Sequence, residues 1–345
     1  AEIAQEYQNL RDAHAGRRSQ KRLRTIHDAR QHRLELDWSV YQPPVPTFTG
    51  LKCFEQYDLA ELSRYIDWTP FFKTWELAGK FPAILDDPIV GEAAHSLYQD
   101  AQAMLQQIIE EKWLEARAVI GLFPANSVGD DIEIYSGGSH HPITTIHTLR
   151  QQMEKPPGRP NLALSDFVAP KETGLQDYIG AFAVTAGIGL DKITARFEAD
   201  HDDYNSILAK ALADRLAEAF AERMHQRVRQ EFWGYAPAES LDNNALISEQ
   251  YQGIRPAPGY PACPDHTEKG ALFCLLNAEA NAGIQLTESY AMQPAAAVSG
   301  YYFAHPESHY FGIGRIDRDQ VEDYAARKEM DIETAERWLA PLLGY

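Results

Sequence analysis

The sequence predicts an α+β domain built around an antiparallel or mixed sheet. Its strand-like runs do not alternate regularly with crossover helices, so a doubly wound parallel sheet is not indicated. Residues 118–136 alternate like two strands joined by a turn of Asn, Gly and Asp. Residues 203–231 carry apolar side chains at helical spacing and predict the longest helix. The chain shows no internal repeat, and we expect a single folded body.

The N-terminal residues 1–36 are predicted to form a charged helical lead-in or linker, because apolar residues are too sparse there for a buried helix. Residues 17–34 within this segment are strongly basic. The proline-rich segment 41–50 interrupts the helical pattern, so we place the folded domain at 37–345. The first residues lack the features of a signal peptide, and we expect a piece of a longer polypeptide.

Two helical segments are predicted ahead of the first strand pair. Residues 51–68 predict a short strand and then a helical turn, with Asp58 as the N-cap and Glu61 completing a capping-box pattern. Residues 91–112 predict an amphipathic helix. Its apolar face is expected to hold Ala93, Leu97, Ala101, Met104, Leu105 and Ile108.

A loop and a buried strand are predicted in the middle of the chain. Residues 155–170 are rich in Pro and Gly and predict a long loop, whereas residues 179–193 predict a strand and a turn. The turn contains Gly187 and Gly189, but a dinucleotide fingerprint needs a third glycine. We expect no helix with an apolar stripe directly after this pair, and therefore favour a tight turn.

The long helix and the C-terminal elements complete the prediction. His201, Asp202 and Asp203 could suggest acid–base chemistry, but carboxylates also suit a helix start, where they complement the helix dipole. After a loop-rich stretch, two strand-like runs and two short helices follow, at 297–303, 310–316, 318–328 and 332–339. The apolar side of the long helix is expected to hold Ile207, Ala211, Leu212, Leu216, Ala219, Phe220, Met224 and Val228.

Composition excludes several classes of protein. The formal net charge of −18 argues against a nucleic-acid binder, because phosphates would be repelled. The sequence has no run of about 18 apolar residues, so no membrane span is expected. An acidic surface fits solubility, or a small-molecule or protein partner. The odd number of irregularly spaced cysteines, Cys53, Cys263 and Cys274, favours reduced thiols in a cytoplasmic protein.

Metal-ligand residue types occur in two places without the frame of a known site. Cys263, Asp265 and His266 lie close together in the sequence, and His305 and His309 are four residues apart. However, there is no CxxC pair and no HExxH, and Pro306 opposes a helix that would carry both histidines. We therefore predict no metal site, and no catalytic dyad can be argued from spacing alone.

The loop at 255–269 carries the clearest candidate binding residues. Its prolines stiffen the chain, so little entropy is left to lose on binding. Arg255 can hold a carboxylate through two parallel hydrogen bonds. Gly259 permits close approach of a ligand to the backbone, and Tyr260 offers a ring and a hydroxyl. A proline-rich surface loop with a solvated arginine remains the alternative from the residues alone.

Four blocks, at 66–82, 251–269, 297–325 and 336–345, give the chain a family resemblance. They resemble, in the same order, the S-adenosylmethionine-binding activation domain of cobalamin-dependent methionine synthase. The resemblance runs from about residue 30 to the C-terminus. It implies a helmet- or C-shaped α+β domain around a twisted, mainly antiparallel sheet, with the ligand along its inner surface.

The resemblance also implies a set of contact residues. Arg255 would bind the methionyl carboxylate, and Asp67 and Glu218 would complement the α-ammonium or the sulfonium, in either assignment. The tyrosines would pack on the ligand and hydrogen-bond its polar edges, and Phe311 would pack or contribute its backbone. The full set is Asp67, Glu218, Arg255, Gly259, Tyr260, Tyr310 and Phe311.

The implied function is reactivation of an oxidised cobalamin. The module would present the methyl group of S-adenosylmethionine to cobalamin on the cobalamin-binding domain of the same polypeptide, with flavodoxin or a flavin reductase as the electron donor. The basic residues 17–34 are a candidate contact for that donor. The alternatives are a self-contained methyltransferase, which would show a Rossmann-like pattern, an S-adenosylmethionine-sensing or interaction module without methyl transfer, and a structural domain that binds no ligand.

Overall fold

The computed structural model describes residues 22–138 and 141–345. Within them, six strands form one sheet in the order β4-β3-β2-β5-β8, with β1 also paired to β2. Every neighbouring pair is antiparallel, which confirms the predicted sheet. Its strands are β1 (Gly50–Tyr57), β2 (Glu115–Val128), β3 (Asp131–Tyr135), β4 (Pro142–His147), β5 (Asp177–Ile188) and β8 (Ala297–Tyr302). A separate two-stranded sheet consists of β6 (Gln285–Leu286) and β7 (Met292–Gln293).

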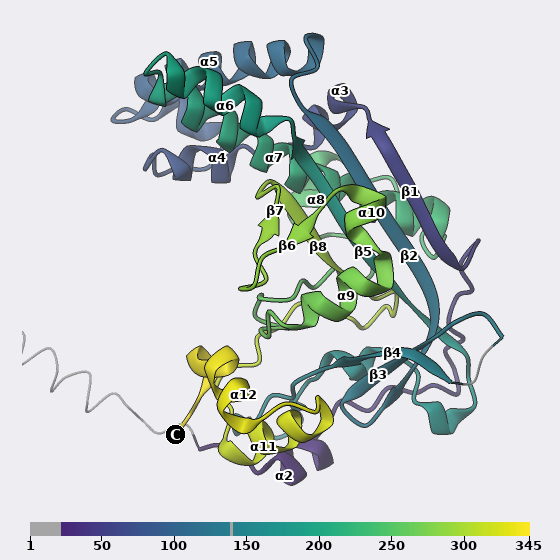
Figure 1. Ribbon diagram of the computed structural model, residues 1–345. Helices are drawn as coiled ribbons and strands as arrows, with labels where there is room; N and C mark the ends of the chain where they lie inside the picture. The colour runs from purple at the N-terminus through teal and green to yellow at the C-terminus, as the bar shows by residue number, and fades with distance from the viewer. Residues whose placement is uncertain (1–21, 139–140) are drawn as a thin grey trace, which may run out of the picture.

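Helices cover both faces of the sheet and both of its ends (Figure 1). The longest is α7, and a π-helical turn at Val228–Phe232 continues it. The α-helices in the described residues are α2 (Ile26–Gln31), α3 (Leu59–Leu62), α4 (Thr69–Thr74), α5 (Gly91–Glu110), α6 (Leu190–Ala199), α7 (Asp203–Arg227), α8 (Asn243–Ile247), α9 (Glu268–Leu276), α10 (Ala278–Ala282), α11 (Arg318–Arg327) and α12 (Ile332–Leu339).

Strand β2 is long enough for its two halves to pair with different strands on the same edge. Gly50 of β1 lies opposite Leu122, whereas Asp131 of β3 lies opposite Val128. The predicted pair of strands at 118–136 is thus confirmed as β2 and β3, with their turn at 129–130. β5 pairs along the other edge of β2, and Figure 1 shows these two long strands running down one side of the molecule.

The buried residues of β5 serve two separate cores, because successive side chains of a strand point to opposite faces. Phe182 packs in one core with Leu216 and Phe220 of α7. Ala183, the next residue, packs in a second core with Leu276 of α9. Burial of both faces explains the nearly unbroken apolar run that predicted this strand.

The molecule is C-shaped in Figure 1. Helices α4, α5 and α6 gather at one end of the long strands, α2, α11 and α12 gather at the other, and both groups project to the same side. A third core, which includes Ile316, Val321 and Leu339, lies under α11 and α12. The predicted α+β class and the C-shape implied by the resemblance are both confirmed.

The helix phases differ from the prediction at two residues. Ala93 is exposed and Ala94 is buried instead, and Ile207 is 46% exposed while Leu208 is buried. One residue corresponds to about 100° around a helix, so an apolar residue at the margin of a stripe is easily assigned to the wrong side. The other apolar positions predicted for α5 are buried.

Two local predictions at helix starts also need correction. Asp58 caps α3 as predicted, but Glu61 does not close a capping box: its carboxylate accepts instead from Arg223 Nε at 2.6 Å. Helix α6 begins at Leu190, directly after the glycine pair, where none was expected. The tight turn itself is present, since Gly189 has a φ of +94° and a Cβ there would lie 2.7 Å from the carbonyl oxygen of Trp113.

Part of the predicted lead-in packs on the body of the domain. In α2, Ile26 and Ala29 are buried, and Arg30 forms ion pairs with Asp130 and Asp323. The backbone N–H of Arg24 donates to the carbonyl of Gln152 at 2.7 Å. Residues 1–21 of the predicted lead-in, including the start of its basic stretch, lie outside the described residues.

Two further features concern the environment of the chain. In the part that the structure describes, no helix is long and apolar enough to cross a bilayer. All three cysteines are free, as expected from their spacing, and Cys263 is buried.

Candidate functional site

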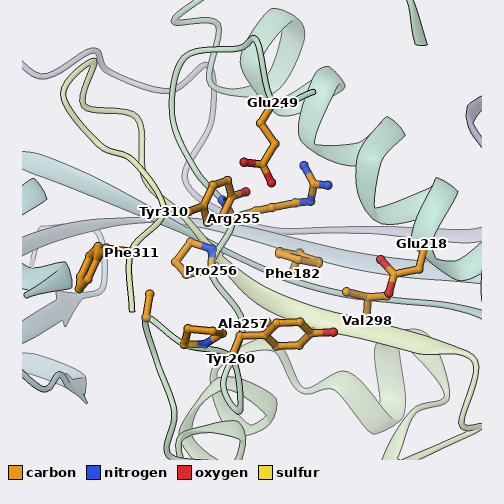
Figure 2. A pocket seen from close by; sticks show the side chains of 12 residues that line it. Phe182, Glu218, Glu249, Arg255, Pro256, Ala257, Tyr260, Val298, Tyr310 and Phe311 are labelled. Atoms are coloured by element: carbon orange, nitrogen blue, oxygen red, sulfur yellow. Dashed lines mark hydrogen bonds between the residues drawn. The ribbon is translucent and has the colours of Figure 1, made fainter. Parts of the chain in front are cut away.

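A pocket of about 460 Å³ opens between helix α7, strands β5 and β8 and the loop that begins at Arg255 (Figure 2). Its floor is apolar and its rim carries charged and aromatic side chains. The lining residues are Phe182, Glu218, Glu249, Arg255, Pro256, Ala257, Tyr260, Pro261, Ala262, Val298, Tyr310 and Phe311. The structure thereby brings together five of the predicted contact residues, namely Glu218, Arg255, Tyr260, Tyr310 and Phe311.

Arg255 is held by a set of polar side chains beside the pocket. Its Nη2 donates to Glu222 Oε2 at 2.7 Å, and its Nη1 donates to the Tyr251 hydroxyl at 2.7 Å. The Nδ1 of His225 lies 3.2 Å from Nη1 and accepts, because a guanidinium can only donate. Burial opposes the charge of Arg255, but Glu222 and the neighbouring tyrosines raise its pKa above the usual value.

His225 is neutral in this arrangement. Burial, together with the positive charges of Arg229 and Arg255, holds the pKa of His225 well below its usual value. Since Nδ1 accepts from Arg255, the ring proton lies on Nε2, which is buried and has no hydrogen-bond partner among the described residues. The positive charge at this end of the pocket therefore belongs to Arg255, with Arg229 behind it.

Two carboxylates face the pocket without partners of their own. Glu218 lies on α7, and Glu249 lies in the loop after α8; both line the pocket that Arg255 also lines (Figure 2). Both side chains are exposed, and within residues 22–138 and 141–345 neither forms an ion pair or a side-chain hydrogen bond. They are free to bind a positively charged ligand group.

Aromatic side chains flank the charged groups. The Tyr310 hydroxyl accepts from the backbone N–H of Arg255 at 3.0 Å, which ties the two parts of the rim together. Tyr260 is 59% exposed, and partial burial and the charge of Glu218 raise the pKa of its hydroxyl. Phe311 packs edge-on against Phe167 with ring centroids 6.2 Å apart.

Gly259 and Asp67 are placed differently from the other predicted contacts. Gly259 has a φ of +96°, and a Cβ there would lie 2.3 Å from the ring of His266. The close approach that requires glycine is therefore made by His266. Asp67 does not line the pocket; its Oδ1 accepts from the backbone N–H of Thr69 at 2.9 Å near the start of α4. Ligand contact by Gly259 and Asp67 stays a prediction.

The residues considered for metal binding and acid–base chemistry have structural partners. Asp265 Oδ2 accepts from the Tyr324 hydroxyl and from Lys328 Nζ, both at 2.7 Å. His309 lies in a loop, and Asp202 caps α7 by accepting from the backbone N–H of Asn205. In the described part of the chain, no group of three or more His, Cys, Asp or Glu side chains could hold a metal ion.

Comparison with known proteins assigns the chain to a family. The family model described as "Vitamin B12 dependent methionine synthase, activation domain" matches residues 58–329. The chain belongs to this family. The activation domain is also similar to a crystal structure described as the MetH reactivation domain bound to AdoHcy, with a TM-score of 0.91 and 57% sequence identity. That similarity covers 94% of this chain and 99% of the other.

Three side chains of the activation domain's site were not predicted. Glu222 follows Glu218 by four residues on α7, but this spacing does not show that its partner is Arg255, 33 residues away. Tyr251 lies four residues before Arg255, outside any helix, so the sequence does not pair these two either. Nothing in the sequence distinguishes Glu249 from other surface glutamates. Its left-handed backbone, with a φ of 56°, is visible only in the fold.

Proposed function

We propose that this activation domain binds S-adenosylmethionine in the pocket. The supporting observation is the distribution of charge among the described residues that line the pocket: one cation, Arg255, and two carboxylates without partners, Glu218 and Glu249. The ligand carries the complementary set, namely an α-carboxylate, an α-ammonium and a sulfonium. The AdoHcy in the similar structure is the thioether that remains when the methyl group has left, which supports the same ligand class.

Each proposed contact follows from the chemistry of its side chain. Arg255 binds the carboxylate through parallel charge-assisted hydrogen bonds. Glu218 and Glu249, with Asp67 as a further candidate, complement the positive groups, and Tyr260 packs on the ligand. Tyr310, Phe311 and Gly259 complete the contact set implied by the family blocks.

The activation domain presents the methyl group to the cobalamin-binding domain of the same polypeptide. When reduced, cobalamin on that domain would supply the nucleophile, and flavodoxin or a flavin reductase would supply the electron. The methyl carbon would form its new bond to that nucleophile as the C–S bond breaks, and the C–S pair would stay on sulfur as a neutral thioether. No proton moves in this displacement, so the pocket needs no base and contributes binding and orientation.

Calorimetric titration with S-adenosylmethionine tests the binding. We expect one site, and a rise in the midpoint of thermal unfolding that increases with ligand concentration. Absence of both heat and a midpoint shift would contradict the proposal.

Methyl transfer is tested by mixing the activation domain with a cobalamin-binding domain, an electron donor and methyl-labelled ligand. Binding without labelled cobalamin would instead support a sensing or interaction module.

A further inference from the structure

We infer that Tyr251 is a positioning residue that orients Arg255 toward the ligand's carboxylate, and so makes the pocket prefer ligands that keep the whole amino-acid chain. This inference rests on the proposed function. The described residues provide acceptors for only some of the N–H donors of Arg255. Glu222 occupies the end of the guanidinium formed by Nη1 and Nη2, and the Tyr251 hydroxyl also accepts from Nη1.

The donors of Arg255 that remain lie together on one side of the group. A guanidinium has five N–H donors in a rigid plane, and Nε shares one edge with Nη2. Among the described residues, none accepts from Nε, and Nη2 has only Glu222 as a partner. This edge matches the two oxygens of a carboxylate, and Arg255 is part of the pocket wall.

Tyr251 is itself fixed by the residues behind it. The guanidinium of Arg229 lies 4.3 Å from the centroid of the Tyr251 ring, and the ring of His225 packs against it edge-on at 4.9 Å. Arg229 is fully buried and forms a bidentate ion pair with Glu239, at 2.8 and 2.7 Å. It belongs to the π-helical turn after α7, so a distortion of the longest helix anchors the tyrosine.

The hydroxyls of Tyr251 and Tyr310 lie next to each other, and each accepts a hydrogen bond from Arg255. The Tyr251 hydroxyl lies 3.3 Å from the hydroxyl of Tyr310, which accepts the backbone N–H of Arg255. Side chain and backbone of Arg255 are therefore held by adjacent hydroxyls. Loss of the Tyr251 hydroxyl would leave the charge of Arg255 paired with Glu222 and remove the 2.7 Å contact that helps to set the tilt of the guanidinium. Only a ligand that presents a carboxylate to the free edge would respond to that change.

The test compares two ligands that differ in the amino-acid part alone. S-adenosylhomocysteine has the carboxylate, and 5′-deoxy-5′-methylthioadenosine keeps the nucleoside and the thioether without it. In Tyr251→Phe, which keeps the ring on Arg229, the Kd for the first ligand should rise about tenfold, as expected for one hydrogen bond to a charged group. The Kd for the second should change by less than about twofold.

Tyr235→Phe is the matched control, because the Tyr235 hydroxyl is buried in the same region and has no hydrogen-bond partner among the described residues. It should leave both Kd values nearly unchanged. An equal weakening of both ligands by Tyr251→Phe would show a general structural effect and overturn the inference, as would unchanged binding of both. Failure of the unaltered protein to bind S-adenosylhomocysteine would instead refute the proposed function.

Discussion

At the scale of single residues, Arg255 is already paired before a ligand arrives. Its partner Glu222 has a side chain only 9% exposed. When a buried carboxylate loses its cation, the folded state is strongly destabilised, because the ion pair no longer offsets the cost of removing the carboxylate from water. Substitutions at Arg255 therefore change two quantities, ligand affinity and folding stability, and an informative variant has to separate them.

We predict that Arg255→Ala weakens S-adenosylmethionine binding at least about tenfold, since a charge-assisted pair contributes about 1.5–3 kcal/mol. It should also lower the free energy of unfolding by about 3 kcal/mol or more, because Glu222 is left unpaired.

The comparison variant is Arg255→Lys, which keeps a cation beside Glu222 but lacks the planar guanidinium that binds a carboxylate through two hydrogen bonds. It should bind nearly as weakly as Arg255→Ala while it unfolds closer to the unaltered protein. Calorimetry and urea unfolding measure the two effects, and unchanged affinity in both variants would place the carboxylate elsewhere.

The sequence predicted those site residues whose role follows from their own side chain and not from a distant partner. Arg255 and Tyr260 stand out in a proline-stiffened loop, and the family blocks supplied Glu218 and Tyr310. Glu222 was missed because its role depends on a partner 33 residues away. The spacing of polar residues on a helix does not reveal which of them a distant loop will meet.

At the scale of elements, the loop from Arg255 to Cys263 is fixed by its own backbone. The N–H of Gly259 donates to the carbonyl of Cys263 at 2.7 Å, and the N–H of Cys263 donates to the carbonyl of Tyr260 at 2.9 Å. The ring of His266 occupies the space where a side chain at position 259 would lie. The shape of the loop thus depends on a glycine at its tightest point.

Gly259→Ala should destabilise the protein by more than backbone strain alone, because its Cβ would meet His266 at 2.3 Å. Gly158→Ala is the control: Gly158 also has a positive φ, of +81°, but nothing lies within 4 Å of a Cβ there. We expect the control to cost about 1 kcal/mol, and Gly259→Ala to cost about 1–3 kcal/mol more in urea unfolding. Equal losses would mean that His266 moves aside freely.

The elements themselves were largely predictable, and their boundaries less so. Alternation and turn residues predicted β2 and β3, and the buried apolar run predicted β5, because these patterns follow from strand geometry. Helix α6 was missed since its charged residues leave only a narrow apolar stripe. The edge of each stripe was uncertain because burial there depends on neighbouring helices.

At the scale of the whole molecule, charged contacts join the end of α11 to α9 and to the loop before it. Lys328 Nζ, at the end of α11, donates to Asp265 Oδ2 at 2.7 Å and to Glu268 Oε1 at 2.5 Å. Both acidic residues are almost completely buried. Burial raises the pKa of Glu268. At Asp265 burial acts in the same direction, but the charge of Lys328 and the hydrogen bonds from Lys328, Thr267 and Tyr324 together outweigh it and lower the pKa. One ammonium group therefore balances two carboxylates.

Lys328→Met should lower the free energy of unfolding by about 3–5 kcal/mol near neutral pH, because both carboxylates lose their cation. Without Lys328 the folded-state pKa of Asp265 would rise above its unfolded value, and that of Glu268, already raised, would rise further. Stability would then be lost as the pH rises through these values. The deficit should therefore be smaller at pH ~5 than at pH ~7.5. Lys210→Met removes an exposed pair with Glu198 and should leave stability nearly unchanged at either pH. A deficit independent of pH would contradict this account.

The overall shape could not be obtained from local patterns. The α+β class followed from the order of strands and helices, but the C-shape was implied only by the family resemblance. It depends on β2 pairing with β1 and β3 on one edge, and on long-range ion pairs such as Arg30–Asp323. Contacts between residues so distant in the chain leave no periodicity in the sequence.

The attachment of α2 has a mechanical consequence. Tension on the chain ahead of residue 22 would be resisted first by the short backbone pairing of 22–24 with 152–154, and then by the ion pairs of Arg30. Those ion pairs lead to Asp130, in the turn before β3, and to Asp323 of α11, at the same end of the molecule as α12 (Figure 1). A pull on residue 22 would therefore load this end of the C, and not the loop that carries Arg255.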